Sequence, residues 1–416
     1  MKTHYEILII GGGTGGIMTA SGLLRKDPDL AVGIIEPSET HWYQPAWTLV
    51  GAGTYNYERT KRSMADVIPK KADWIKDSVV SFDPEDNSVT TKLNGIYTYD
   101  YLVVAPGLKL DTSLVEGLPE TIDQGVVCSN YTNPNHTWDV IKNFKGGTAL
   151  FTQPPKPYKC GGAPQKIMYL ADDHFRRSGV KKKTGIVFAS ASDIIFSVPE
   201  IAKTLMKVVH RKGINVKFNH ELKKIDSVKQ IAWFKVTPDF EEINHNGAID
   251  TYKDNSFVGI KYDMIHLVPP NTPPDFIKKS PLADEAGWVD VDQYSLQHKK
   301  YPNIFSLGDV SNLPTSKTGA AIRKQAPVVV SNLIRLVELQ KLSNKRYDGY
   351  SSCPFVTGYG KMVLAEFDYS KKFTPDPKLK RMLIKDSSKE HWRLWILKKY
   401  ILPFLYWNMM LKGKEV

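Results

Sequence analysis

An α/β fold is predicted by three features of the sequence. Residues 6–36 follow the pattern strand, glycine-rich turn, helix, strand. A second alternation of strands and helices occupies residues 147–218. An apolar run at 303–307 then ends on a Gly-Asp pair, as a further strand would. Strands that alternate with helices form parallel sheets covered by helices, so the sequence indicates two Rossmann-like domains.

The first of these domains is expected to be discontinuous. It comprises residues 1–115 and 290–340, because the run at 303–307 supplies a returning strand. Residues 116–289 form the second Rossmann-like domain, and residues 341–416 form a C-terminal region of different character. A chain of 416 residues is too long for one simple core, which agrees with this division.

A dinucleotide-binding fingerprint opens the first domain. Gly11, Gly13 and Gly16 follow a strand directly and open a helix. The first glycine makes the tight turn, the second lets the backbone approach a pyrophosphate, and the third lets the helix pack on the strand. The pyrophosphate then sits at the helix N-terminus, where free N–H groups attract negative charge. Glu36, twenty residues after Gly16, is predicted to accept hydrogen bonds from the ribose.

The choice between FAD and NAD depends on the returning strand. Gly308 and Asp309 end that strand, and a carboxylate there suits the ribityl hydroxyls of a flavin. Residues 317–320 then lead into a helix, whose N-terminus and Lys317 can stabilise the negative charge of a reduced flavin. Asp309 alone is also compatible with a helix cap. Together with the N-terminal fingerprint it favours FAD.

The second domain lacks a phosphate-binding loop. After the strand that ends at Thr152, residues 153–160 read QPPKPYKC, where phosphate-binding glycines would be expected. Prolines have no N–H group to offer a phosphate. We therefore predict that this domain has no working NAD site and that NADH is not the electron donor.

Only three cysteines are present, which indicates a reducing compartment and a catalytic role rather than a structural disulfide. Cys160 precedes a predicted helix and follows Lys159, and both features lower the pKa of a thiol. Cys353 lies 193 residues further along, and the sequence alone does not establish that the two meet. Cys128 sits in an apolar run and is expected to be a small buried side chain.

The charge pattern favours a membrane surface as partner. The net charge is +12, yet no zinc-finger spacing or RNA-reading motif is present, so we expect no nucleic acid partner and no metal site. Residues 371–400 hold ten Lys or Arg against three Asp or Glu, interleaved with Trp and Leu. Residues 394–411 are apolar but interrupted by lysines and a proline, so they suit interfacial attachment rather than a span. The alternative is a C-terminal helix that packs on the protein's own core.

Five stretches together carry a family resemblance. They are residues 36–38 with 43–45, residues 159–170 (KCGGAPQKIMYL), residues 313–318, residues 347–353 and the tail at 403–410. In this order along the chain they resemble the sulfide:quinone oxidoreductases, in the branch that contains the mitochondrial enzyme. The resemblance covers nearly the whole chain.

The resemblance implies the site residues. Cys160 and Cys353 would form the redox pair, and Lys317 and Lys398 would lie near the flavin and the active site. With the residues derived above, the predicted cofactor contacts are Gly11, Gly13, Thr14, Gly15, Gly16, Glu36, Gln44, Val79 through its backbone, Gly107, Gly308, Asp309, Lys317, Thr318, Gly319 and Ala320.

The resemblance also implies the reaction. Hydrosulfide would attack a disulfide between the two cysteines, leaving a persulfide on Cys353 and a thiolate on Cys160. The electrons would pass through FAD to a quinone, ubiquinone or menaquinone. Sulfite, glutathione or a second sulfide would take the sulfur. A homodimer is left open.

The first strand begins almost at the N-terminus and leaves no room for a leader, so we expect a peripheral protein on the cytoplasmic face of a bacterial plasma membrane, with the mitochondrial inner membrane as the alternative. Three rival functions are considered. A type II NADH:quinone dehydrogenase would need a second glycine fingerprint, and a flavocytochrome-linked sulfide dehydrogenase would need an export signal. A non-enzymatic FAD-containing redox sensor is the third.

Overall fold

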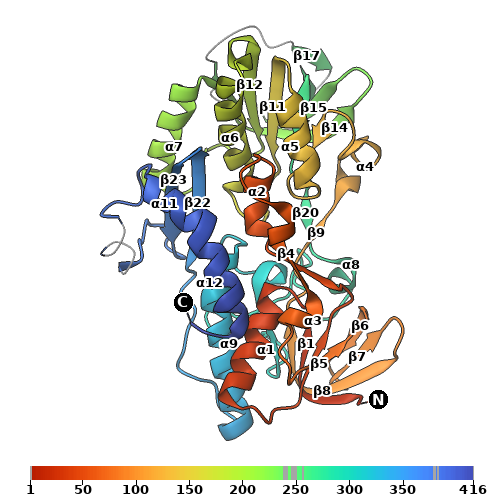
Figure 1. Ribbon diagram of the computed structural model, residues 1–416. Coiled ribbons are helices and arrows are strands. Elements are labelled where there is room, and N and C mark those ends of the chain that lie inside the picture. The colour runs from red at the N-terminus through yellow and green to blue at the C-terminus, as the bar shows by residue number, and fades with distance from the viewer. Residues whose placement is uncertain are drawn as a thin grey trace.

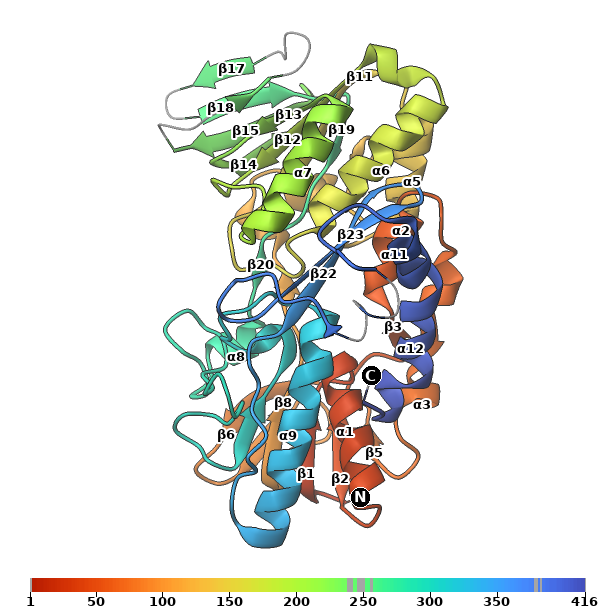
Figure 2. The ribbon, with the colours of Figure 1, turned by 90° about the vertical axis from the view of Figure 1, so that its left-hand side faces the viewer.

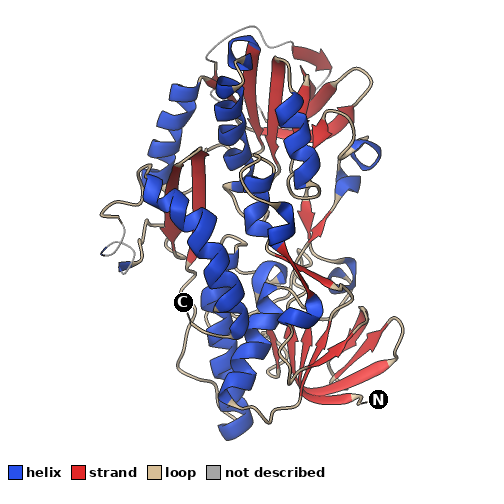
Figure 3. Ribbon diagram, in the orientation of Figure 1, coloured by secondary structure: helices blue, strands red, loops and turns tan. Residues whose placement is uncertain are grey.

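Two α/β domains lie at opposite ends of an elongated molecule, with the C-terminal segment running along one side of both (Figure 1). The computed structural model describes residues 2–237, 242–244, 251–254, 257–377, 381 and 384–415. Figure 3 shows the strands of each domain gathered into sheets with helices outside them. The fold class predicted from the sequence is confirmed.

The first domain contains a seven-stranded sheet in the order β5-β2-β1-β8-β7-β6, with β21 paired to β8. β21 arrives from two hundred residues downstream and runs parallel to β8, with Phe305 opposite Val103, so this domain is discontinuous as predicted. The elements are β1 (His4–Ile10), α1 (Thr14–Lys26), β2 (Val32–Ile35), β5 (Asp73–Ile75), β6 (Val79–Asp83), β7 (Ser88–Thr91), β8 (Ile96–Val104), β21 (Ile304–Ser306) and α9 (Gly319–Leu339).

Burial explains why β1 forms the centre of this sheet. Ile7, Leu8 and Ile9 are fully buried and face neighbours on both sides, β2 and β8, in parallel register. A strand covered on both faces needs a continuous apolar run rather than alternation. The carboxyl ends of these parallel strands meet at one edge, which is where the glycine turn lies.

The second domain has a sheet in the order β10-β19-β11-β12-β13-β16, parallel except for β16. The elements are β10 (Val127–Cys128), α5 (Pro134–Asn143), β11 (Gly147–Gln153), α6 (Ala163–Arg177), β12 (Thr184–Ser190), α7 (Pro199–Lys212), β13 (Ile214–Lys217), β16 (Glu242–Ile243) and β19 (Met264–His266). A separate antiparallel sheet, not predicted from the sequence, contains β14 (His220–Asp226), β15 (Ile231–Val236), β17 (Thr251–Asp254) and β18 (Phe257–Lys261).

Short elements join the domains and frame the site. They are β3 (Thr40–Trp42), α2 (Trp47–Val50), η2 (Tyr57–Thr60), β4 (Lys61–Ser63), α3 (Met64–Val67), β9 (Lys109–Leu110), α4 (Leu118–Thr121), β20 (Asn271–Thr272) and α8 (Asp275–Lys278). β9 pairs antiparallel with β20, so one small ribbon connects the end of the first domain to the end of the second.

The C-terminal region is a hairpin followed by helices. The hairpin consists of β22 (Ser351–Gly358) and β23 (Lys361–Phe367), and the helical segment consists of α11 (Trp392–Ile396), a π-helical turn at Leu397–Ile401 and α12 (Leu402–Asn408). Figure 2 shows α11 and α12 along one edge of the molecule, with α12 near β3 and α3. Within the described ranges, no helix combines the length and the apolar character needed to cross a membrane.

Candidate active site

The glycine turn after β1 is shaped for close approach by a phosphate. Gly11 has a φ of +101°, and a Cβ there would lie 2.5 Å from the carbonyl oxygen of Ala105. A Cβ on Gly16 would collide with the carbonyl oxygen of Gly11, whereas a Cβ on Gly13 would meet nothing within 4 Å. The open space at Gly13 lies at the start of α1, whose first turn has no side-chain cap and no acidic residue. These features fit a pyrophosphate at the helix N-terminus.

Glu36 is held in place by backbone donors. The Gly12 N–H donates to one carboxylate oxygen and the Ser38 N–H donates to the other, both at 2.7 Å. A carboxylate accepts about four hydrogen bonds, so Glu36 retains capacity for ribose hydroxyls. The sequence interpretation did not include Gly12, because the fingerprint assigns that position no role.

The end of β21 brings a carboxylate and a lysine together. Gly308 has a φ of +80° and turns the chain so that Asp309 is partly buried, and burial raises the pKa of the Asp309 carboxyl. Lys317 Nζ donates to the carbonyl oxygens of Asp309 and Ser311 at 2.6 and 2.9 Å. Burial lowers the pKa of Lys317 to about 8. α9 begins two residues later, so Lys317, Thr318, Gly319 and Ala320 stand at a helix N-terminus as predicted.

The loop after β11 carries a cysteine where a nucleotide-binding domain would carry glycines. Pro154, Pro155 and Pro157 occupy it, and Cys160 has a φ of +79°. α6 begins at Ala163, three residues after the cysteine. The loop therefore offers a thiol rather than a row of N–H groups.

Two sulfur atoms from distant parts of the chain meet at this loop. The Cys160 and Cys353 Sγ atoms lie 3.5 Å apart, one in the loop before α6 and the other on β22. The hydrogen bond from the Cys353 thiol and the charge of Lys166 lower the pKa of Cys160 well below its usual value, against the opposing effect of burial. Burial and the Cys160 thiolate raise the pKa of Cys353. These opposite shifts favour a thiolate at Cys160 and a thiol at Cys353 in the reduced pair.

The cation that contacts Cys160 differs from the one expected. Lys166, one turn into α6 and almost fully buried, donates to Cys160 Sγ at 3.3 Å. Lys159 instead directs its Nζ to Gln44 Oε1 at 2.7 Å, although its charge still acts on the thiolate. The sequence interpretation missed Lys166 and assigned its role to Lys159. The helical spacing that places Lys166 back over Cys160 was the available signal.

The predicted flavin segments and the cysteine pair are adjacent. Lys159 and Lys317 form a parallel β-bridge, so Cys160 lies one residue from the segment that leads into α9. Lys398 Nζ donates to the carbonyl oxygen of Pro45 at 2.8 Å, beside Gln44. Burial, with a contribution from the Lys166 charge, lowers the pKa of Lys398 to about 7. Segments from all three predicted domains, those that carry Lys159, Lys317, Pro45 and Lys398, thus lie close to the cysteine pair.

The remaining predicted residues belong to other strands and turns of the two domains. Val79 begins β6, four residues after β5 ends at Ile75, and the Ile75 carbonyl accepts from the Glu36 N–H at 3.0 Å. Gly107, with a φ of +78°, lies in the turn after β8 and has open space beside it. Cys128 is fully buried in β10 and takes no part in the sulfur pair.

The C-terminal segment contributes side chains that the sequence interpretation did not identify. Tyr406 on α12 hydrogen-bonds Thr14 Oγ1 at 2.8 Å and His41 Nε2 at 2.6 Å. Ser21 Oγ donates to the Leu411 carbonyl oxygen at 2.7 Å, so the segment is also fixed to α1. The buried face of the tail therefore packs against the glycine turn and α1.

The chain is similar to known proteins in both sequence and fold. Residues 5–140 match the model of the family described as "Pyridine nucleotide-disulphide oxidoreductase". The chain is 42% identical over 99% of its length, and 87% of the relative, to the mitochondrial sulfide:quinone oxidoreductase of Mus musculus. It is 45% identical over 100% of its length, and 87% of the relative, to the mitochondrial sulfide:quinone oxidoreductase of Dictyostelium discoideum. The solved sulfide:quinone oxidoreductase of Aquifex aeolicus has the same fold, with a TM-score of 0.76 at 20% identity, covering 100% and 92% of the two chains.

Proposed function

Because the chain belongs to the sulfide:quinone oxidoreductase family, we propose that it oxidises hydrosulfide at the Cys160–Cys353 pair and passes the electrons through a flavin to a quinone. The observation that supports this most directly is the 3.5 Å separation of the two sulfurs beside the segment that leads into α9. The cofactor is a flavin. Sulfur chemistry and flavin chemistry are thereby adjacent in one site.

The opposite pKa shifts of the two thiols support a first step in which hydrosulfide attacks Cys353. In the oxidised enzyme, hydrosulfide attacks the Cys160–Cys353 disulfide, one S–S bond breaks, and a new one forms to the attacked sulfur. The thiol of lower pKa is the better leaving group. Attack therefore falls on Cys353, which becomes a persulfide, and Cys160 leaves as a thiolate.

Lys166 stabilises the thiolate that this step releases. Its Nζ donates to Cys160 Sγ, so the negative charge forms beside a fixed ammonium group. A nucleophile such as sulfite, glutathione or a second sulfide then removes the sulfane sulfur and leaves two reduced cysteines. When bound, a flavin supplies a two-electron acceptor for the return of the pair to the disulfide.

The site suits FAD rather than a smaller flavin. Gly13 and the start of α1 would hold a pyrophosphate, and Glu36 would accept from the adenosine ribose, so both halves of a dinucleotide have partners. Asp309 would accept from the ribityl chain. The N-terminus of α9 and Lys317 would face the pyrimidine edge of the flavin ring, where reduction places negative charge.

The C-terminal helices are proposed to lie on a membrane, where the quinone resides. Trp392, Ile396, Tyr400 and Phe404 recur every four residues and are 61%, 39%, 56% and 61% exposed. Residues four apart share one helix face, so these side chains form an apolar row, while Leu394 and Leu397 pack inward. Such a face with flanking cations is typical of interfacial helices.

The membrane location, the quinone, the sulfur acceptor and the oligomeric state remain predictions. The compared relatives from mouse and Dictyostelium are mitochondrial, and nothing in the comparisons supports the bacterial cytoplasmic face expected from the sequence. We propose peripheral attachment without assigning the organelle. Ubiquinone or menaquinone as acceptor, the identity of the sulfur acceptor and a homodimer are likewise predictions.

NADH:quinone oxidation is the rival that shares the quinone acceptor. The loop after β11 opposes it, because prolines at 154, 155 and 157 offer no N–H groups to a nucleotide phosphate. The other rival is a redox sensor that does not turn over and so would need no electron acceptor for the flavin. The exposed apolar row of the C-terminal helices opposes it, because that row suits an enzyme that meets a lipid-soluble acceptor.

Substitution of each cysteine tests the proposal. Cys160→Ser and Cys353→Ser should each retain bound FAD and lose sulfide-dependent bleaching of the flavin, because neither can form the disulfide. Cys128→Ser is the matched control, since Cys128 is buried away from the pair, and it should bleach as the wild type does. Normal bleaching in either Cys160→Ser or Cys353→Ser would overturn the proposal.

A further inference from the structure

We propose that a groove beside α12 binds the headgroup of an anionic phospholipid. This groove, called the C-terminal groove, has a volume of about 790 Å³ and lies between the η2–α3 segment and α12. This inference rests on the proposed membrane attachment. The apolar row alone would bind any lipid surface, whereas the groove would favour anionic phospholipids.

Cations dominate the polar lining of this groove. Arg59, Arg62, Lys399 and Lys412 line it against a single carboxylate, Asp66. In the part of the chain that the structure describes, none of these four cations forms an ion pair. Four positive charges around one negative charge leave an excess that an anionic group would neutralise.

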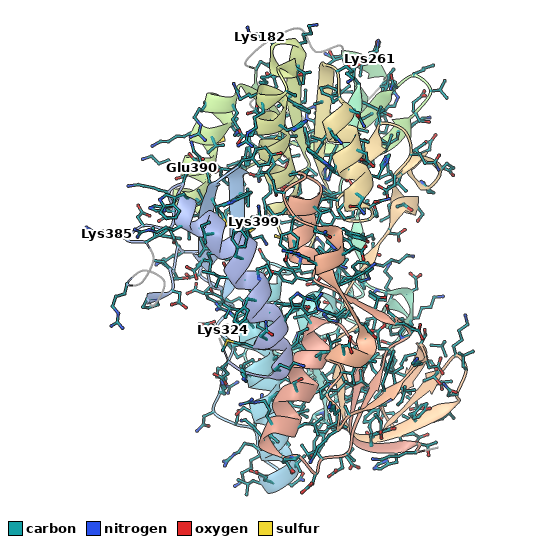
Figure 4. The ribbon with its side chains drawn as sticks, in the orientation of Figure 1. Lys182, Lys261, Lys324, Lys385, Glu390 and Lys399 are labelled. Atoms are coloured by element: carbon teal, nitrogen blue, oxygen red, sulfur yellow. The ribbon has the colours of Figure 1, made fainter. Side chains whose placement is uncertain are left out.

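Two of these cations are held by aromatic rings. The Arg62 guanidinium lies 4.7 Å from the ring centre of Trp407. Lys399 Nζ lies 5.5 Å from the ring centre of Tyr400, and Figure 4 shows Lys399 on the C-terminal helical segment. Cation–π contacts hold these cations beside the groove. Arg62 Nη1 donates to the Lys61 carbonyl oxygen, and the other N–H groups of the two cations are available to phosphate oxygens.

The apolar wall of the groove continues into the membrane-facing row. Tyr400 and Phe404 line the groove and also belong to the exposed row on α11 and α12. Pro403 and Trp407 complete the same wall. A ligand that carries both a phosphate and an acyl chain would meet the cations and the aromatic wall together.

This combination separates a phospholipid from the other available ligands. A quinone is uncharged, so it does not account for four unpaired cations. A free phosphate ion has no apolar part, so it does not account for Tyr400, Phe404 and Trp407. An anionic phospholipid satisfies both parts of the lining, and near a membrane surface each basic residue contributes about 1 kcal/mol to binding such lipids.

Vesicle binding by the FAD-loaded full chain tests this inference. Co-sedimentation is measured with phosphatidylcholine vesicles and with vesicles that also contain phosphatidylglycerol. The Arg59→Gln/Lys412→Gln variant should bind the anionic vesicles about 30-fold more weakly and bind neutral vesicles unchanged. The control is Lys182→Gln/Lys183→Gln, which removes the same charge from exposed residues of the second domain. Figure 4 shows Lys182 at the tip of that domain, away from the C-terminal helices. The control variant should bind as the wild type does.

Further experiments distinguish a lipid headgroup from free phosphate, and the lipid site from the proposed enzymatic function. Phe404→Ser should weaken binding to both kinds of vesicle, because it removes apolar contact and no charge. Inorganic phosphate at matched ionic strength should not displace the protein. Equal loss in the two charge variants, or displacement by phosphate, would overturn the inference. Bleaching of the flavin by sulfide is measured separately in solution. If the wild-type protein does not bleach, the proposed function is refuted, whereas the lipid site is decided by the vesicle data alone.

Discussion

The phenol oxygen of Tyr406 lies 2.6 Å from Nε2 of His41, although 365 positions separate the two residues. His41 Nδ1 lies 3.0 Å from the Gly12 carbonyl oxygen, and Thr14 Oγ1 lies 2.8 Å from the same phenol. Burial lowers the pKa of His41 to about 4, so the ring is neutral near pH 7. The helix proposed to touch the membrane is therefore hydrogen-bonded to the turn proposed to hold the pyrophosphate.

Tyr406→Phe should loosen this turn. The substitution keeps the ring packing but leaves His41 Nε2 buried without its partner, which costs about 1–3 kcal/mol. We expect a lower free energy of unfolding and weaker binding of FAD to the apoprotein, measured by denaturant titration and by flavin fluorescence.

The control for this prediction is Tyr359→Phe, which removes a hydroxyl that donates to the Ala52 carbonyl oxygen at 2.9 Å. It should cost stability without changing FAD affinity. Unchanged FAD affinity in Tyr406→Phe as well would show that the tail does not order the glycine turn.

A pair of neighbouring glycines tests the packing of the sulfur pair. A Cβ on Gly162 would lie 2.6 Å from Cys353 Sγ and 2.5 Å from Phe355 Cε1, whereas a Cβ on Gly161 would come no closer than 3.4 Å to any atom. Gly162→Ala should push Cys353 away and slow disulfide formation, measured by thiol titration during air oxidation. Gly161→Ala should oxidise at the wild-type rate. Equal rates in both variants would contradict the geometry.

Lys166→Met should raise the pKa of Cys160. The substitution removes an ammonium group that donates to the thiolate, so the neutral thiol persists to higher pH. The rate of alkylation by iodoacetamide, followed against pH in the reduced Cys128→Ser background, reports this change. The same experiment with Lys159→Met should give a smaller displacement of the profile, because that lysine is bonded to Gln44. The reverse order would contradict the assignment.

Lys398→Met should change the pH dependence of stability. Burial lowers the pKa of Lys398 to about 7, whereas the unfolded chain has the ordinary value near 10.5, so the unfolded state binds more protons between these values. The wild-type protein therefore gains stability as pH rises from about 7 to about 10.5, and it bears the full cost of the buried charge below pH 7.

Relative to wild type, the Met variant should be most favoured below pH 7, with the difference shrinking toward pH 10.5. Denaturant unfolding across this range measures it. Lys399→Met, at the adjacent half-buried position, should show no such trend. A stability difference independent of pH would contradict a buried, titrating Lys398.

The glycine turn and the returning strand could be predicted because each depends on neighbouring residues only. The spacing of Gly11, Gly13 and Gly16 after an apolar strand specifies a turn and a helix start, because collisions at Gly11 and Gly16 exclude side chains there. The run at 303–307 predicted a returning strand, since an apolar segment that ends on Gly-Asp fits the edge of a parallel sheet. These features need only neighbouring residues to be interpreted.

Long-range proximity accounts for one contact that was missed, since Tyr406 reaches His41 only after the tail has folded back over α1. The contact of Lys166 with Cys160 is local, and the helical spacing in the first turn of α6 was a signal that could have predicted it. The antiparallel β14–β18 sheet was missed because its strands follow the α/β alternation without a helix between them.

Anaerobic addition of sulfide to the FAD-loaded protein is the most direct test of whether sulfide is the electron donor. Absorbance of the oxidised flavin is followed after sulfide, and in a separate sample after NADH. We expect sulfide to bleach the flavin, NADH to leave it oxidised, and a quinone analogue to restore the colour after sulfide. Bleaching by NADH with no response to sulfide would contradict this expectation.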